Sequence, residues 1–165
     1  MIRGGHFMTR SDRKPRPSGR RVGALVIMLG SLLLCGAPLR AEDEQAEALA
    51  ILDAFMAAFN ARDITAFEAT FHFPHVRIAS GHVTVLPEAG TRSNALFEAL
   101  AETGWHHSAW LERKVVQAGP GKVHLAVRFA RFNEAGGLLK EYDSLYIVER
   151  RGERWGIVAR LSYAP

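Results

Sequence analysis

Cysteine is almost absent from this 165-residue sequence, in which Cys35 is the single example. Cys35 falls within the first 41 residues, which have the character of a leader, so the domain that follows is expected to be free of cysteine. Disulfide bonds are then excluded as a source of its stability, and an oxidising compartment poses no thiol hazard. A chain of about 124 residues buries roughly two-thirds of its unfolded surface, so one domain of this size needs no cross-link.

Acidic residues are scarce at the N-terminus. Residues 1–41 hold eight Lys and Arg but only one acid, Asp12, whereas the remainder holds 13 Lys and Arg and 16 Asp and Glu. The basic balance of the whole chain therefore belongs to the leader, and the domain after it has a net negative charge. A nucleic-acid-binding domain would show a basic surface, so we expect no nucleic-acid partner.

The first 41 residues have the three-part layout of a secretory signal peptide. Residues 1–21 are basic, residues 22–34 form an apolar run, and the short segment that follows ends in Leu39-Arg40-Ala41. We predict cleavage after Ala41 and a periplasmic or secreted protein, whose membrane contact is limited to this segment during export.

Other interpretations of the leader stay open. Residues 22–39 are just long enough for an uncleaved membrane anchor. A start at Met8 would shorten the long basic region, and Arg20-Arg21 would suit a twin-arginine route, although its flanking residues match that route poorly. Lipidation of Cys35 is not expected, because the two residues before it are leucines rather than small residues.

After residue 41, hydrophobic periodicity predicts the element order α-α-β-β-α-β-β-β-β. The first expected helix covers residues 42–60. A second, shorter helix is capped by Asp63, includes Phe71 and is stopped by Pro74. A third helix is capped by Ser93 or Thr91 and ends near Gly104. The expected strands are residues 75–79, 83–85, 110–117, 123–129, 138–150 and 155–163. Early helices followed by a long antiparallel meander are typical of an α+β fold.

Three segments are informative in combination: FNARDITAFEATFH at residues 59–72, FPHVRIASG at residues 73–81 and YDSLYIVERRGERWGIVARLSYAP at residues 142–165. Together they resemble the nuclear transport factor 2-like superfamily, in its SnoaL-like and ketosteroid-isomerase-like branch. The resemblance covers residues 42–165 and implies a cystatin-like cone, in which a curved antiparallel sheet wraps around N-terminal helices. It also implies a pocket at the open end and, in many members, a homodimer. Members include enzymes and non-catalytic domains, so no reaction is implied.

Enzymes of the branch that the sequence resembles often carry a carboxylate base on the first hairpin, but no Asp or Glu occurs between Glu68 and Glu88. This absence counts against proton transfer of the ketosteroid-isomerase type. His75 is the remaining candidate base, since an imidazole exchanges protons near neutral pH. It shares a strand face with Arg77, and the pair would bind and deprotonate an anionic substrate if that face lines the cone.

The apolar pattern of this strand favours another interpretation. Val76 and Ile78 alternate with His75 and Arg77. Apolar residues usually mark the buried face of a strand, so the pattern favours Val76 and Ile78 against the core and the two polar side chains in solvent.

Tyrosines supply a candidate hydrogen-bond donor. Tyr142 and Tyr146 lie on one face of the strand 138–150, and a hydroxyl in a dry pocket can stabilise an oxyanion. The same rings could equally be packing residues. Our candidate catalytic residues are His75 and Tyr146, and the predicted pocket residues are Phe55, Phe59, Arg77, Trp110, Tyr142 and Arg160.

Histidines raise the question of a metal site. His72 and His75 form an H-x2-H pair, with His106 and His107 further along. The spacing is not helical and no carboxylate accompanies it, so we expect no metal. Glycine-rich phosphate loops and nucleophile elbows are also missing, and we expect no cofactor.

The sequence leaves two hypotheses. The first is an exported SnoaL-like domain that binds a small organic ligand in its cone and could support cofactor-free acid–base catalysis. The second is a non-catalytic homodimeric or protein-interaction domain whose cone is plugged by Phe55, Phe59, Phe71 and the tryptophans.

Overall fold

The structure is a computed structural model that describes residues 37–165, with side chains from residue 41 onward. Residues 35–165 form one unit, and the fold below is that of its described part. The predicted signal peptide therefore lies outside the described residues except for its last few positions. None of the helices in the described part combines the length and the hydrophobicity that a membrane span requires.

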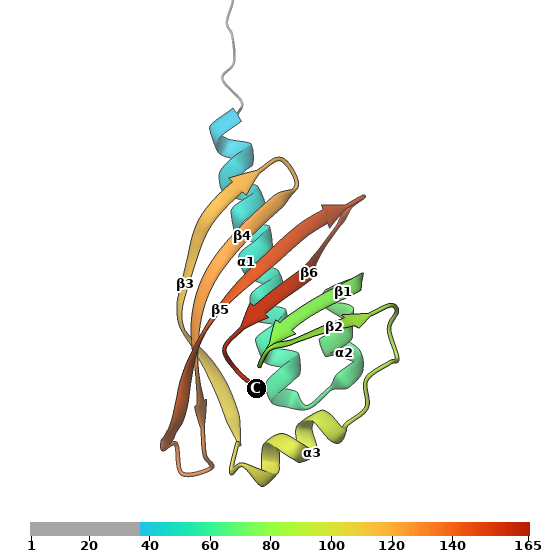
Figure 1. Ribbon diagram of the computed structural model, residues 1–165. Coiled ribbons are helices and arrows are strands. Elements are labelled where there is room, and N and C mark those ends of the chain that lie inside the picture. The colour runs from blue at the N-terminus through green and yellow to red at the C-terminus, as the bar shows by residue number, and fades with distance from the viewer. Residues whose placement is uncertain (1–36) are drawn as a thin grey trace, which may run out of the picture. The chain divides into compact units, whose positions relative to one another are not determined.

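Three helices belong to the fold (Figure 1). They are α1 at Ala37–Ala61, α2 at Ile64–Ala69 and α3 at Ala95–Glu102. Asp63 caps α2 as predicted, since its carboxylate accepts a hydrogen bond from the amide of Ala66 at 2.9 Å. The helix boundaries differ from the prediction in that α1 begins before Glu42, α2 ends before Phe71, and Asn94 rather than Ser93 or Thr91 precedes α3.

Six strands form one sheet with the order β2-β1-β6-β5-β4-β3. They are β1 at Phe71–Ala79, β2 at His82–Leu86, β3 at His107–Gly119, β4 at Lys122–Phe132, β5 at Leu138–Arg151 and β6 at Arg154–Ser162. The order of helices and strands and the α+β class are as predicted. Pro74 lies within β1, after a cis peptide bond, instead of ending a helix.

The sheet is mixed rather than wholly antiparallel. Four neighbouring pairs are antiparallel, but β1 and β6 run parallel, so the prediction of an antiparallel sheet is wrong at this pair. Parallel neighbours need a long crossover between them, and the whole segment from β2 to β5 provides it. This pairing joins the N-terminal hairpin to the C-terminal meander and thereby brings Arg77 directly beside Arg160.

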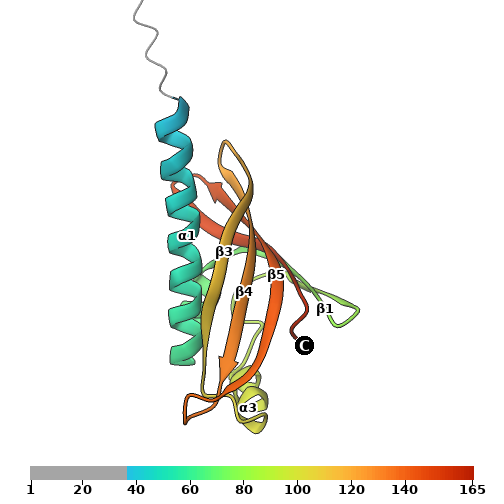
Figure 2. The ribbon, with the colours of Figure 1, turned by 90° about the vertical axis from the view of Figure 1, so that its left-hand side faces the viewer.

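Helix α1 lies lengthwise along β3 and β4 (Figure 2). The Trp110 indole on β3 donates to the Leu52 carbonyl of α1 at 3.3 Å. On β4, Val123 and Leu125 are completely buried, and they pack with Leu52 and Phe55 in one core cluster. Burial of one such side chain contributes about 1.5–3 kcal/mol. We call this helix-covered side of the sheet its inner face.

On β1 the inner face is the polar one. His75 is completely buried and Arg77 lies partly buried on the same side, whereas Ile78 on the other side is 40% exposed. The prediction that Val76 and Ile78 face the core is therefore wrong. Alternation identifies the two faces of a strand but does not show which is buried, and here the outer face of the sheet is apolar too.

Candidate ligand-binding site

A cavity of about 410 Å³ opens between the inner face of the sheet and the three helices. Its lining comes from all nine elements, from the loop before α3 and from the C-terminal tail: Phe55, Met56, Phe59, Phe67, Arg77, Thr84, Leu86, Arg92, Leu96, Leu100, Ser108, Trp110, Phe129, Arg131, Tyr146, Arg160, Ser162, Ala164 and Pro165. The cone is thus not completely filled by its aromatic side chains.

Aromatic rings form one wall of the cavity. Phe55 and Phe59 lie on successive turns of α1, with ring planes nearly parallel and centroids 6.1 Å apart. Trp110 meets Phe129 of β4 edge-on at 6.2 Å and Tyr146 of β5 at 5.8 Å. Such interlocked rings hold one another in place, so this wall is rigid and apolar.

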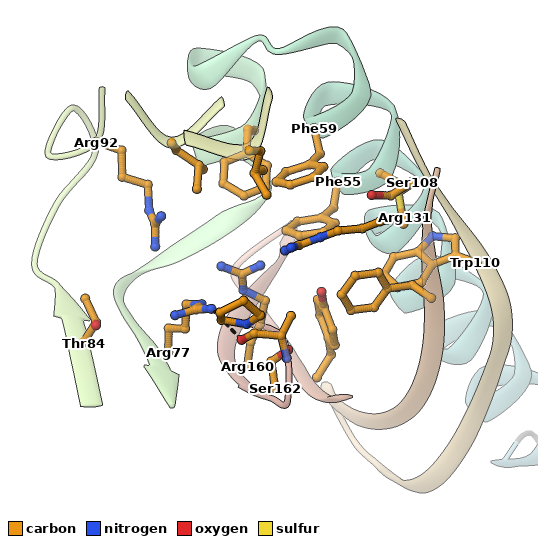
Figure 3. A pocket seen from close by; sticks show the side chains of 18 of the residues that line it. Phe55, Phe59, Arg77, Thr84, Arg92, Ser108, Trp110, Arg131, Arg160 and Ser162 are labelled. Atoms are coloured by element: carbon orange, nitrogen blue, oxygen red, sulfur yellow. Dashed lines mark hydrogen bonds between the residues drawn. The ribbon is translucent and has the colours of Figure 1, made fainter. Parts of the chain in front are cut away.

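Four arginines form the polar part of the site. Arg77 comes from β1, Arg160 from β6, Arg131 from β4, and Arg92 from the loop before α3. Figure 3 shows that their guanidinium groups point from different sides toward the middle of the cavity. No element supplies more than one of them, so the cluster exists only in the folded chain.

Contacts with the surrounding fold fix three of these arginines. Arg77 donates to the Ala164 carbonyl at 3.0 Å. The Arg160 guanidinium lies 5.0 Å from the Phe55 ring centroid, and that of Arg131 lies 4.9 Å from the ring of Tyr142. The aromatic faces offset part of the cost of burying these positive charges.

Mutual repulsion acts across the cluster. Burial and then the charges of Arg160 and Arg77 lower the pKa of Arg92 to about 10. Burial and then the charge of Arg160 lower the pKa of Arg77, and burial lowers that of Arg131. Each group stays protonated at neutral pH, so the cavity holds a concentration of positive charge.

His75 does not line the cavity but lies behind Arg160. Its Nδ1 lies 3.0 Å from the Ile157 carbonyl oxygen, and its Nε2 accepts a hydrogen bond from Nε of Arg160 at 3.3 Å. Burial and then the charge of Arg160 lower the pKa of His75 to about 3. A base needs a free lone pair facing its substrate, and this imidazole has none. The geometry therefore argues against His75 as a base and makes it a positioning residue for Arg160.

The two candidate tyrosines differ in position. Tyr146 lines the cavity and is 3% exposed, and burial raises its pKa while the charge of Arg160 opposes that rise. Tyr142 is not among the lining residues. Its ring lies between Phe129, 5.4 Å away, and the cations of Arg131 and Lys140. Tyr142 therefore supports the site from outside.

Among the other candidate residues, Phe55, Phe59, Arg77, Trp110 and Arg160 all line the cavity. Sequence reasoning missed Arg92 and Arg131. Arg131 continues the inward alternation of Val123, Leu125 and Val127 on β4, and that periodicity was sufficient to find it. Arg92 belongs to a loop, where no periodicity shows the direction of a side chain.

The histidines of the two pairs either have a structural role or lie near the surface. Nδ1 of His72 accepts from Arg154 at 2.7 Å, and its Nε2 lies 3.1 Å from two carbonyl oxygens. His106 and His107 lie next to one another near the surface, with their Nδ1 atoms 3.2 Å apart. Within residues 37–165, no group of three or more His, Cys, Asp or Glu is arranged to hold a metal ion.

A curved sheet that encloses a helix and a cavity defines the cystatin-like class of NTF2-like proteins, and solved structures of that class are similar to this one. A ketosteroid isomerase-like protein from Erwinia carotovora atroseptica SCRI1043 has 23% identity and a TM-score of 0.56, with 73% of this chain and 95% of that one covered. An NTF2-like protein with a cystatin-like fold from Novosphingobium aromaticivorans has 14% identity and a TM-score of 0.63, with 82% and 90% covered. At these identities the similarity establishes the fold alone.

The chain itself belongs to a particular NTF2-like family. The family described as "NTF2-like protein (DUF6841)" matches residues 43–165, which is nearly all of the described domain. No curated protein matches the sequence. The family membership establishes the superfamily that the sequence resembles and leaves the function to be argued from the site.

Proposed function

We propose that this domain binds a small organic ligand in the cavity between the sheet and its helices. The observation that carries the proposal is the cavity itself, whose volume of about 410 Å³ falls in the range of small-molecule sites. An aromatic wall with a few converging polar groups is also typical of such sites. Phe55 and Phe59, which were candidates to plug the cone, border the cavity instead.

Binding is better supported than acid–base catalysis. Among the described residues that line the cavity there is no Asp, Glu, His, Lys or Cys. Tyr146 remains as a proton donor, but no lining residue of this part of the chain is suited to be its partner base at neutral pH. We therefore assign the arginines and the aromatic wall to recognition.

A blocked cavity tests the proposal. Thr84 on β2 lines the cavity and is exposed, so Thr84→Trp should place an indole in the cavity with little effect on the core. Val116→Trp adds the same group at a position of β3 that is 51% exposed and does not line the cavity. In a thermal-shift screen of small organic compounds, ligands that raise the melting temperature of the wild type and of Val116→Trp should fail to do so with Thr84→Trp. Equal shifts in both variants would place binding elsewhere. If no compound in a broad screen bound to the protein, the proposal would fail.

The outer face of the sheet supports a second proposal, a homodimer. Val83, Ile78, Leu161 and Leu145 form one row across β2, β1, β6 and β5, with each residue directly opposite the next. The neighbouring row is also apolar and consists of Val85, Val76, Ala159 and Ile147. Val83 and Val85 are 67% and 56% exposed. A twofold-related copy would bury such a patch against itself, so we propose that a second copy of this chain covers it.

We also propose that residues 1–41 export the domain to the periplasm or the exterior. This proposal rests on the sequence, because that segment lies almost wholly outside the described residues.

A further inference from the structure

The arginine cluster has little balancing negative charge within residues 37–165. Glu68, at the end of α2, is the carboxylate whose charge raises the pKa of Arg92. Its two oxygens accept hydrogen bonds from the amides of Gly90 and Arg92, so it is held by backbone outside the cavity lining. Pro165 also lines the cavity, so its α-carboxylate and Glu68 bring two negative charges near four guanidinium groups, and the site keeps a net positive charge.

Two of the arginines also have unused donors. The Nε atoms of Arg92 and Arg131 are buried and have no hydrogen-bond partner within the described residues. Arg131 as a whole is only 9% exposed. A buried cationic donor without an acceptor is costly, and an oxyanion that pairs with these two guanidinium groups would offset part of that cost.

The positions of the four groups indicate more than one negative charge. Arg77 and Arg160 are directly opposite one another on β1 and β6, and Arg92 and Arg131 approach from the loop and from β4 (Figure 3). A monoanion would neutralise only a minor part of the positive charge of this cluster. The planar fork of a guanidinium binds carboxylate and phosphate oxygens in pairs, so several forks suit an oxyanion with several acceptor oxygens.

We infer that the ligand is an amphipathic organic dianion, a phosphate monoester or a dicarboxylate, whose oxyanion lies among Arg77, Arg92, Arg131 and Arg160 and whose apolar body packs on the aromatic wall. This inference rests on the proposed function, since it names the chemistry of the ligand in the same cavity. Phe55 and Trp110 provide the surface for the apolar body next to the cationic groups.

Calorimetric titration of the full chain at pH 7.5 with matched naphthalene probes tests the charge. The probes are neutral 1-naphthol, monoanionic 1-naphthalenesulfonate, dianionic 1-naphthyl phosphate and naphthalene-2,3-dicarboxylate, and inorganic phosphate is titrated alone. Naphthyl phosphate, the dicarboxylate or both should bind about tenfold or more tightly than the sulfonate, because further charge-assisted hydrogen bonds form. Whichever dianion binds more tightly identifies the head group.

Two variants and one control locate the oxyanion. Arg92→Gln and Arg131→Gln should each weaken binding of the preferred dianion by about tenfold or more and leave naphthol binding unchanged, which also reports an intact cavity. Arg128→Gln removes the same charge from an exposed position on the strand of Arg131 and should have no effect.

Three outcomes would overturn the inference. If naphthol bound as tightly as the dianions, the cavity would be a ligand site without the proposed charge preference, and the proposed function would survive. If inorganic phosphate bound as tightly as naphthyl phosphate, the apolar body would have no role. If none of the probes bound, the ligand proposal and this inference would both fail.

Discussion

Nε of Arg160 donates a hydrogen bond to Nε2 of His75 across 3.3 Å, and this contact joins the cavity to the core behind it. The acceptor must be unprotonated for the bond to exist, and burial beside a guanidinium keeps it so. A residue that the sequence offered as a base is therefore a fixed neutral acceptor that orients one of the four cavity arginines.

The first prediction concerns pH. The free energy of unfolding should fall as the pH falls below about 6.5, because the unfolded chain takes up a proton at His75 that the folded protein excludes down to about pH 3. Each pH unit in this window costs at most about 1.4 kcal/mol per histidine of this kind. His72 acts in the same direction, since burial and then the charge of Arg154 lower its pKa. Urea unfolding between pH 7 and pH 4.5 measures the slope.

A matched variant separates the contributions of His75 and His72 to this pH dependence. In His75→Gln the slope below pH 6.5 should be smaller than in the wild type, and the part due to His72 should remain. NMR of the folded protein should show no titration of the His75 ring between pH 5 and pH 8. A His75 inflection near pH 6.5 would contradict the arrangement.

The second prediction concerns the stability of the empty site. Arg92→Gln should raise the free energy of unfolding by about 0.5–2 kcal/mol in phosphate-free buffer, because it removes one of four mutually repelling charges while the backbone bond to Glu68 is retained. Arg128→Gln removes an exposed ion pair with Asp143, which solvent screens, so the free energy of unfolding should change little. Thermal unfolding of both variants against the wild type decides the sign. A destabilised Arg92→Gln would mean that the cluster does not repel itself.

The third prediction concerns the contact between β1 and β6. A Cβ added at Gly156 would lie 2.8 Å from Cδ2 of His72 and 3.1 Å from its backbone nitrogen. Gly156→Ala should therefore cost about 1–3 kcal/mol through overpacking. Gly119→Ala is the control, since nothing lies within 4 Å of its new methyl group, and it should change stability by no more than about 0.5 kcal/mol. Denaturant midpoints that coincide for the two variants would show that this close approach is absent.

The fourth prediction concerns the oligomer. If a second copy covers the outer face, Ile78→Lys should convert a dimer to a monomer, because it places a charge at the centre of the apolar rows. Glu112→Lys, at an exposed position on the distant strand β3, should leave the dimer intact. Sedimentation equilibrium measures both. A wild type that is monomeric at micromolar concentration would reject the homodimer.

The fifth prediction concerns the N-terminus. Protein isolated from the envelope or medium of its native host should begin at Glu42. Residues 41–43 are exposed and Glu44 is the first buried residue of α1 after them, so cleavage after Ala41 would remove no buried side chain of this stretch. N-terminal sequencing supplies the measurement. An intact Met1 or Met8 in soluble cytoplasmic protein would refute export.

The sequence predicted most of the fold because the signals for its helices, turns and strands are local. The Asp63 cap, the Ser80-Gly81 turn and the inward alternation on β4 each depend on a few neighbouring residues. The parallel pairing of β1 with β6 depends on residues about 80 positions apart, for example Arg77 and Arg160, and no local pattern encodes it. For the same reason the orientation of Val76 and Ile78 was predicted wrongly.

The candidate site was accessible to sequence reasoning only in part. Its aromatic residues follow helical or strand periodicity, which is how Phe55, Phe59 and Trp110 were found. The arginine cluster is assembled from three strands and a loop that are distant in sequence, so the sequence did not reveal that four such side chains meet. The neutral state of His75 depends on the same long-range assembly, because Arg160 lies on another strand.

The bond from Arg77 to the Ala164 carbonyl has a consequence for how tightly a ligand can be held. This carbonyl accepts from one of the five N–H donors of the Arg77 guanidinium, and it fixes the direction of the long side chain before anything enters the cavity. Less rotational freedom then remains to be lost on complex formation, and a preorganised cation binds its partner more tightly than a loose one.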